Sequence, residues 1–162
     1  MPSIQYLPTF PDRPTNPART NVRTGDIEIN RARWNGLTPE QRMFVLQHEV
    51  GHYRLQTFDE VQADRYALKQ LAGKKPYSLI NYLNAVREVS YNNPTRVQAA
   101  QYDTLRIAAK KGSKKAQELL NRYAAADGEE QTELQPSNRW IYTLAIVLTI
   151  GLIFIIAEIK GI

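Results

Sequence analysis

Two histidines and a glutamate at a fixed spacing form the most chemically distinctive group in this sequence. The stretch from His48 to His52 reads His-Glu-Val-Gly-His, and it contains both histidines of the chain. Residues four positions apart lie on the same face of an α-helix, so the two imidazoles can bind one metal ion. Glu49 lies beside them and can act as a general base on a metal-activated water molecule. The motif therefore predicts a Zn²⁺ site that hydrolyses peptide or amide bonds.

A zinc site of this kind needs a third protein ligand, which must come from outside the motif. The metzincin pattern requires a Gly and a His three and six residues after the second histidine. Those positions are Leu55 and Phe58, so that class is excluded. Glu60 is the natural candidate for the third ligand, and Asp59 is its rival.

The spacing of polar residues after the motif predicts how a second helix returns past the first. Thr57 and Glu60 have the spacing of a capping box, so a helix is expected to begin at Thr57. Two helices joined by such a short turn form an antiparallel hairpin, in which facing residues have position numbers with a constant sum. Glu60 is then expected to face His52. By the same rule Asp64 faces His48 one turn deeper, where its carboxylate can orient the imidazole.

The motif, followed by Glu60 and Asp64, resembles the gluzincin family of zinc peptidases. Residues 60–67, Glu-Val-Gln-Ala-Asp-Arg-Tyr-Ala, are more similar to the small gluzincins, which include membrane-bound heat-shock and prenyl-protein endopeptidases and metallopeptidases of phages and mobile elements. The resemblance covers about residues 26–72. It implies His48, His52 and Glu60 as zinc ligands, Glu49 as general base and Asp64 as the residue that orients a histidine. The segment between His52 and Glu60 is much shorter than the segment between the corresponding ligands of thermolysin-like enzymes.

The resemblance implies two further parts of the site. Gluzincins often stabilise the reaction's oxyanion with a downstream His or Tyr, and this chain has no third His, so the donor must be a Tyr or an Arg. The candidates are Tyr66, Tyr77, Tyr82, Tyr91, Tyr102 and Arg106. Gluzincins also bind extended substrate along the free edge of a strand that precedes the active-site helix. By resemblance that strand contains Ile27, Glu28, Ile29 and Asn30, although the same residues also fit a strand paired within its own small sheet.

The elements that must position these residues can be inferred from local signals. Residues 1–24 carry a proline at every third position from 8 to 17, which predicts an extended, loosely held arm. A docking segment, or an edge strand at residues 4–7, is the alternative. A short strand is expected within 25–30, and helices are expected over 38–56, 57–71, 78–90, 95–111 and 113–125. Gly51, in the middle of the first helix, costs about 1 kcal/mol relative to Ala, which close approach of another backbone would explain.

The predicted fold class is α+β and predominantly helical. Residues 25–126 are expected to form a minimal zincin-like domain with a small N-terminal sheet, an active-site helical hairpin and further helices. Residues 127–138 are acidic and Gln-rich without apolar periodicity, which indicates a flexible linker. Residues 140–157 carry no charge, and as a helix they would be about 27 Å long, close to the thickness of a bilayer core. A transmembrane helix is therefore expected over 139–160.

Charge and composition limit where the protein can act. Most Lys and Arg residues precede the apolar segment, which favours a single-pass, tail-anchored protein whose catalytic domain lies in the cytoplasm, or in the interior of a membrane-containing virion. The chain has 162 residues and no cysteine, which excludes disulfides and thiolate metal ligands. Its net charge of +5 suits an anionic membrane or nucleic acid, but a nucleic-acid role would rest on charge alone.

The sequence as a whole predicts a membrane-anchored zinc metallopeptidase. Its partners would be a lipid bilayer, through residues 140–157, and a peptide or protein substrate. Two alternatives compete with this interpretation. One is a zinc-binding but non-catalytic, membrane-tethered interaction protein, and the other is a phage- or virion-associated peptidoglycan peptidase.

Overall fold

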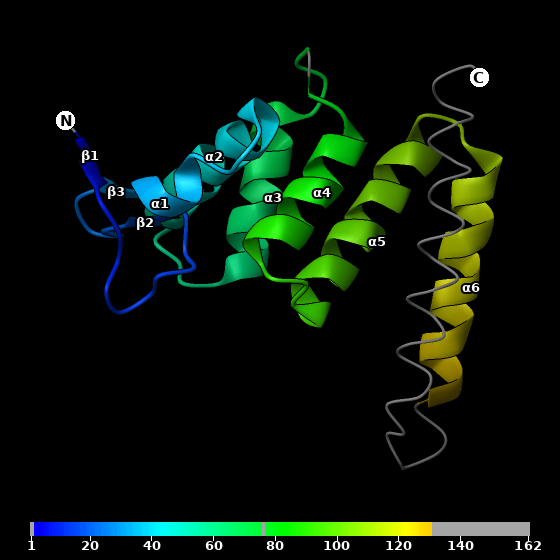
Figure 1. Cartoon of the computed structure of the whole chain (residues 1–162). Helices are drawn as coiled ribbons and strands as arrows, with labels where there is room; N and C mark the ends of the chain where they lie inside the picture. The colour runs from blue at the N-terminus through cyan, green and yellow to red at the C-terminus, as the bar shows by residue number, and fades with distance from the viewer. Residues whose placement is uncertain (1, 76, 131–162) are drawn as a thin grey trace. The chain divides into compact units, whose positions relative to one another are not determined.

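The structure is a computed structural model that describes residues 2–75 and 77–130 (Figure 1). In chain order its elements are β1 (Ile4–Leu7), β2 (Ala18–Thr20), β3 (Ile27–Asn30), α1 (Arg31–Trp34), α2 (Pro39–Leu55), α3 (Glu60–Leu71), α4 (Leu79–Val89), α5 (Pro94–Lys110) and α6 (Lys114–Glu130). The architecture is α+β and mostly helical, as the sequence predicts. The chain divides into two compact units after Ala100, and the first unit contains the whole sheet and α1 to α4.

The three strands form one small sheet in the order β1-β3-β2. Strand β3 pairs in parallel with β1 and antiparallel with β2, with Ile27 opposite Ile4 and Ile29 opposite Ala18. Ile27 and Ile29 are buried and anchor the sheet in the core. Because β3 is the central strand, the expectation that Ile27, Glu28, Ile29 and Asn30 offer a free edge to substrate is wrong. Strands β1 and β2 are the edges of this sheet.

The N-terminal segment is docked onto the domain, which corrects the expectation of a loosely held arm. Phe10 is completely buried, and the side chain of Asn30 donates hydrogen bonds to the carbonyl oxygens of Pro14 and Asn16 at 3.0 and 2.9 Å. The polar, proline-rich composition of this segment is typical of an arm. Phe10 supplies an apolar anchor, and the Asn30 amide satisfies backbone carbonyls that a polyproline segment leaves open.

Helix α2 begins where the sequence predicts. The Thr38 hydroxyl accepts from the backbone N–H of Gln41, and the Gln41 side chain accepts in return from the backbone N–H of Thr38, so both halves of a capping box are present. The middle of the helix is buried and includes Phe44, His48 and His52. The two histidines therefore face the interior of the domain.

Helix α3 begins three residues later than expected. Its N-cap is Asp59, whose carboxylate accepts from the backbone N–H groups of Val61 and Gln62 at 2.8 and 3.1 Å. The hydroxyl of Thr57 instead accepts from the backbone N–H of Asp59. A carboxylate is a better cap than a hydroxyl at the positive end of a helix, so Asp59 prevails over Thr57.

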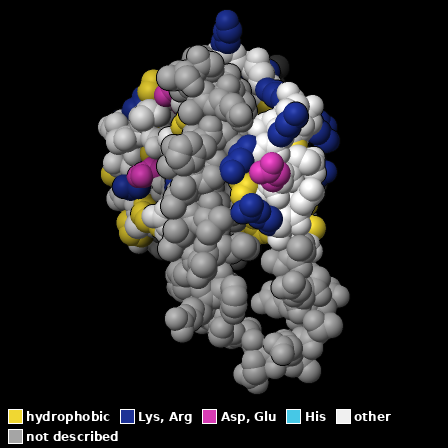
Figure 2. Space-filling view, turned by 90° about the vertical axis from the view of Figure 1, so that its right-hand side faces the viewer, with side chains coloured by type: hydrophobic (Ala, Val, Ile, Leu, Met, Phe, Trp, Pro, Cys, Tyr) yellow, Lys and Arg dark blue, Asp and Glu magenta, His cyan; other side chains and the backbone are white. Residues whose placement is uncertain are grey.

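The later helices follow the predicted order. On α4 the buried ring of Tyr82 packs edge-on against Phe44, with ring centroids 5.8 Å apart. Helix α6 continues to Glu130, beyond the expected end at 125 and into the first residues of the predicted linker. In the second unit, Tyr102 and Tyr123 pack edge to face at 5.8 Å. Figure 2 shows a face of the molecule on which the described charged side chains are mostly Lys and Arg.

The predicted membrane segment, residues 139–160, lies outside the described residues. The remainder of the predicted linker, residues 131–138, lies outside them as well. Among residues 2–75 and 77–130, no helix combines the length and the apolar character needed to cross a bilayer.

Candidate metal centre

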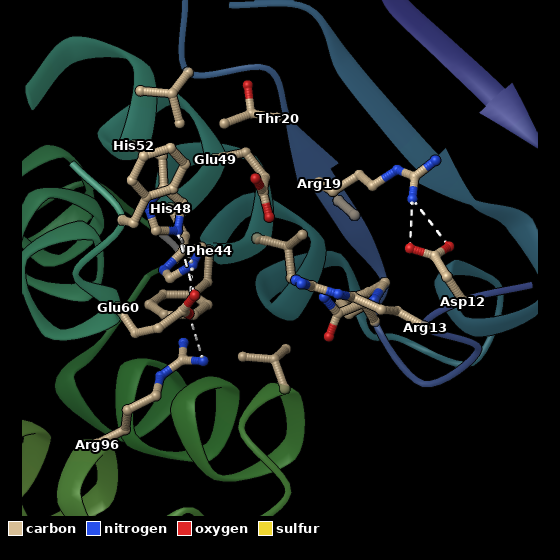
Figure 3. Close-up of a pocket in the computed structure, with 17 residues that line it drawn as sticks. Asp12, Arg13, Arg19, Thr20, Phe44, His48, Glu49, His52, Glu60 and Arg96 are labelled. Atoms are coloured by element: carbon tan, nitrogen blue, oxygen red, sulfur yellow. Dashed lines mark hydrogen bonds and ion pairs between the residues drawn. The ribbon is translucent and has the colours of Figure 1, made fainter. Parts of the chain in front are cut away.

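Two imidazoles and a carboxylate converge at one point between α2 and α3 (Figure 3). The ligand atoms of His48, His52 and Glu60 all lie within 4.8 Å of one another. The two Nε2 atoms are 3.0 Å apart, and Glu60 oxygens lie 3.2 Å from His48 Nε2 and 3.7 Å from His52 Nε2. Two imidazole nitrogens and one carboxylate oxygen form a donor set that suits Zn²⁺ and leaves a position for water. The three residues can therefore hold a metal ion.

The second nitrogen of each imidazole is held by an oxygen acceptor. His48 Nδ1 lies 2.8 Å from Asp64 Oδ1, as the helical hairpin predicts, and His52 Nδ1 lies 2.8 Å from the carbonyl oxygen of Thr57. A carbonyl oxygen can only accept, so His52 Nδ1 carries the proton and its Nε2 keeps the lone pair. Contacts of this kind orient metal-binding histidines in many proteins.

Asp59 lies apart from this group. Its carboxylate caps α3, and the hydrogen bond from the backbone N–H of Gln62 is the main reason that its pKa is lowered. Of the two acids that the sequence left as third ligand, Glu60 is the one that lies beside the histidines.

Burial and charge together set the protonation of the two histidines. Burial lowers the pKa of His48, but the hydrogen-bonded carboxylates of Asp64 and Glu60 outweigh it and raise that pKa to about 9. Burial and the neighbouring His48 lower the pKa of His52. A cationic His48 thus balances the carboxylates in the metal-free protein. Binding of a metal to its Nε2 would displace that proton.

Glu49 is buried in the same cavity. Burial raises its pKa to about 7, against the attraction of His48 and a hydrogen bond from the backbone N–H of Thr20. A carboxylate whose pKa lies near neutrality can both accept and return a proton, which suits a general base. Glu49 thus lies beside His48, His52 and Glu60, which we call the metal group, and its position fits the role of general base that the motif suggests.

A cavity of about 370 Å³ opens in front of these side chains. Helix α2 forms one wall, and the N-terminal segment forms the facing wall with residues between Asp12 and Val22, including β2 (Figure 3). Phe58 lies at the rim with 83% of its surface exposed. The segment that the sequence presented as an arm is thus a wall of the candidate site.

None of the four predicted oxyanion donors in the first unit, Tyr66, Tyr77, Tyr82 and Tyr91, lines this cavity. The Tyr91 hydroxyl donates to the carbonyl oxygen of Thr15 at 2.7 Å, and Tyr77 and Tyr82 are buried in the core. The lining of the cavity therefore gives no support to the prediction for Tyr66, Tyr77, Tyr82 and Tyr91. Tyr102 and Arg106 belong to the second unit, and for them the prediction stays a prediction. The side-chain N–H donors that do line the cavity, among the described residues, belong to Arg13, Asn16, Arg19, His48, His52 and Arg96.

Arg96 is the functional candidate that sequence reasoning missed. It lies in the first turn of α5, and its Nη1 is 2.9 Å from Glu60 Oε2. Its Nε and Nη2 donate to the two oxygens of Asp64 at 2.9 and 2.7 Å. Nothing in the local pattern links position 96 to positions 60 and 64. The available signal was the buried carboxylate of Asp64, which needs a cation or hydrogen-bond donors around it.

Comparisons of the chain with protein-family models, with curated proteins and with solved structures give no match.

Proposed function

We propose that this protein is a zinc-dependent metallopeptidase of the gluzincin type. His48, His52 and Glu60 would hold the metal, and Glu49 would act as the general base. The observation that supports the proposal best is the convergence of the three ligand atoms within 4.8 Å. The buried position of Glu49 in the same cavity adds to it, because a purely structural metal site has no use for a base there.

The proposed roles follow from what each side chain can do. When bound, zinc supplies a Lewis acid for the scissile carbonyl and lowers the pKa of a water molecule. The Glu49 carboxylate takes the proton of the attacking water and returns it to the nitrogen of the leaving amine. Asp64 and the Thr57 carbonyl hold the two imidazoles so that their Nε2 atoms stay directed at the metal.

Strand β2, rather than β3, would receive the substrate. The carbonyl oxygen of Pro17 accepts from the backbone N–H of Asn30 and so faces β3. Backbone groups alternate along a strand, so those of Ala18 and Thr20 point to the cavity side. An extended peptide can add to this edge by main-chain hydrogen bonds. The Thr20 N–H donates to Glu49, and this contact supports the assignment because the proposed general base would lie next to the proposed peptide.

The proposed location is a membrane, reached through the apolar segment 139–160 as a single-pass, C-terminal anchor. The support is the uncharged run of residues 140–157. The full-length protein is expected to stay in the membrane pellet after extraction with alkaline carbonate. A variant with Leu148→Arg and Ile150→Arg, which puts two charges at the centre of the run, should be released. Release of the unmodified chain would contradict the anchor.

The direct test measures metal content and cleavage on the same full-length preparation in mild detergent. Elemental analysis should give about one zinc per chain, and mass spectrometry of a peptide library should detect cleavage products. Glu49→Gln should keep the zinc and lose cleavage, whereas His48→Ala should lose both. Absence of zinc after reconstitution would contradict the proposal. Zinc without any cleavage would instead favour the non-catalytic alternative. A library that includes peptidoglycan cross-link peptides addresses the peptidoglycan alternative.

A further inference from the structure

Arg96 joins the candidate third ligand to the acid that orients a histidine. We propose that Arg96 is a positioning residue that holds Glu60 as a one-oxygen metal ligand, an inference that rests on the proposed metal site. One guanidinium contacts both carboxylates, Glu60 through Nη1 and Asp64 through Nε and Nη2. Its planar fork of donors allows such simultaneous contacts, which a lysine ammonium cannot reproduce in the same geometry.

The two carboxylates differ in how firmly the fold holds them. Asp64 is buried one turn into α3, whereas the side chain of Glu60 is 50% exposed at the first residue of that helix. An exposed Glu loses rotamer freedom when it ligates a metal. Because the Arg96 side chain is only 13% exposed and fixed on Asp64, it can hold Glu60 in place before the metal arrives. The ordering of Glu60 then accompanies folding rather than metal binding.

The contact also distinguishes the two oxygens of Glu60. Oε2 accepts from Arg96 at 2.9 Å and lies 3.2 Å from His48 Nε2. Oε1 lies 3.7 Å from His52 Nε2. With Oε2 engaged by the guanidinium, Oε1 is the freer of the two oxygens for a metal. Ligation through one oxygen leaves a coordination position for water, which a catalytic zinc site requires.

The charge of Arg96 and its positioning of Glu60 have opposite expected effects on the affinity for zinc. The positive charge of Arg96 repels a divalent cation, so its removal would strengthen metal binding if Coulomb effects dominated. If positioning dominates, loss of the fork weakens binding even when the charge is kept. Arg96→Lys keeps the charge and loses the fork, and Arg96→Gln loses the charge.

The experiment measures the affinity of the full-length protein for Zn²⁺ by competition with a chromophoric chelator, without any substrate. We expect Arg96→Lys and Arg96→Gln to bind zinc about 10- to 100-fold more weakly, the range found when partners of metal ligands are removed. Arg13→Lys is the matched control, because Arg13 lines the facing wall of the same cavity and no described contact joins it to the ligands. Its affinity should stay within about twofold of the unmodified protein.

The absorption spectrum of the Co²⁺-substituted protein gives a second readout. We expect Arg96→Lys to change the intensity of the visible bands, because the coordination by Glu60 changes. Unchanged affinity and spectrum in Arg96→Lys, or tighter zinc binding in Arg96→Gln, would overturn the inference and leave the proposed function intact. An unmodified protein that binds no metal would overturn both. Far-UV circular dichroism restricts the comparison to folded variants, and Arg96→Lys keeps a cation near the buried Asp64.

Discussion

Gly51 on α2 lies against the backbone of Ala63 on α3. A Cβ at Gly51 would lie 3.2 Å from both the Cα and the carbonyl oxygen of Ala63, and 3.0 Å from Cβ of Tyr66. The sequence suggested that a second backbone would approach this glycine closely, and the structure confirms it. The close approach brings His48 and His52 on one helix within reach of Glu60 on the other.

Replacement of Gly51 by Ala is therefore expected to destabilise the hairpin. The substitution gains about 1 kcal/mol in helix propensity. The added methyl group meets atoms of Ala63 and Tyr66 at 3.0–3.2 Å, and overpacking of this kind costs about 1–3 kcal/mol. We expect a lower free energy of unfolding in urea and weaker zinc binding. Gly36→Ala is the control, since the nearest atom to its Cβ would be 3.6 Å away. A hairpin that became more stable in Gly51→Ala would contradict this packing.

Asp64→Asn tests whether the carboxylate behind His48 contributes to metal binding. The asparagine keeps the size of the side chain but removes the charge that the imidazole Nδ1 and Arg96 both contact. We expect zinc affinity to fall about 10- to 100-fold. Asp59→Asn is the comparison, because that side chain caps α3 and lies outside the metal group. Equal affinities in the two variants would argue against a role for Asp64 in positioning His48.

Loss of the Glu49 carboxylate should separate chemistry from metal binding. Glu49→Gln keeps the shape of the side chain but cannot accept a proton from water. We expect kcat to fall about 100- to 10,000-fold, with the zinc content unchanged. The measurement is steady-state cleavage of the best library peptide beside elemental analysis. Activity within a few-fold of the unmodified protein would remove Glu49 from the mechanism.

Binding of substrate along β2 predicts a periodic response to backbone methylation. Only alternate amides of an extended peptide face the strand that it joins. Replacement of one such N–H by N-methyl should raise KM about 2- to 10-fold, the value of one hydrogen bond. Methylation of the amides between them should have little effect on KM. A scan along the peptide checks this, and a response without alternation would exclude addition to the β2 edge.

A carboxylate that anchors β1 gives a pH dependence of stability. Hydrogen bonds from the side chains of Thr24 and Ser3 and from the backbone of Ser3 lower the pKa of Asp26 to about 2. An unfolded Asp has a pKa of about 4. The stabilisation is therefore fully present above pH 4 or so and is lost as the pH falls through about 2.

Two measurements check this assignment. NMR should show the Asp26 carboxyl titrating near 2 in the folded protein. In Asp26→Asn, the part of the acid destabilisation that arises between about pH 4 and pH 2 should be reduced. A titration midpoint near 4 would show that the three hydrogen bonds do not persist in solution.

The hairpin of α2 and α3, which carries the candidate metal ligands, could be predicted from the sequence because its signals are local. His48 and His52 lie on one helix, and a short turn fixes which residues of α3 face them. The start of α3 differs from the prediction because Thr57 and Asp59 are both able to cap, and the carboxylate is the better cap at the positive end of the helix. The wall formed by residues 12–22 and the contact of Arg96 with Glu60 depend on contacts between distant parts of the chain. No periodicity in the sequence encodes such contacts.

The strands proposed to bind substrate and the residues proposed to carry out the reaction lie in different parts of the chain. All three strands lie within residues 4–30, whereas the candidate ligands and base lie within residues 48–60. The wall of the cavity that faces the metal group is thus encoded by one continuous stretch that ends before α2 begins. We therefore expect exposed substitutions within that stretch to change which peptides bind, while the proposed reaction at His48, His52, Glu60 and Glu49 is kept.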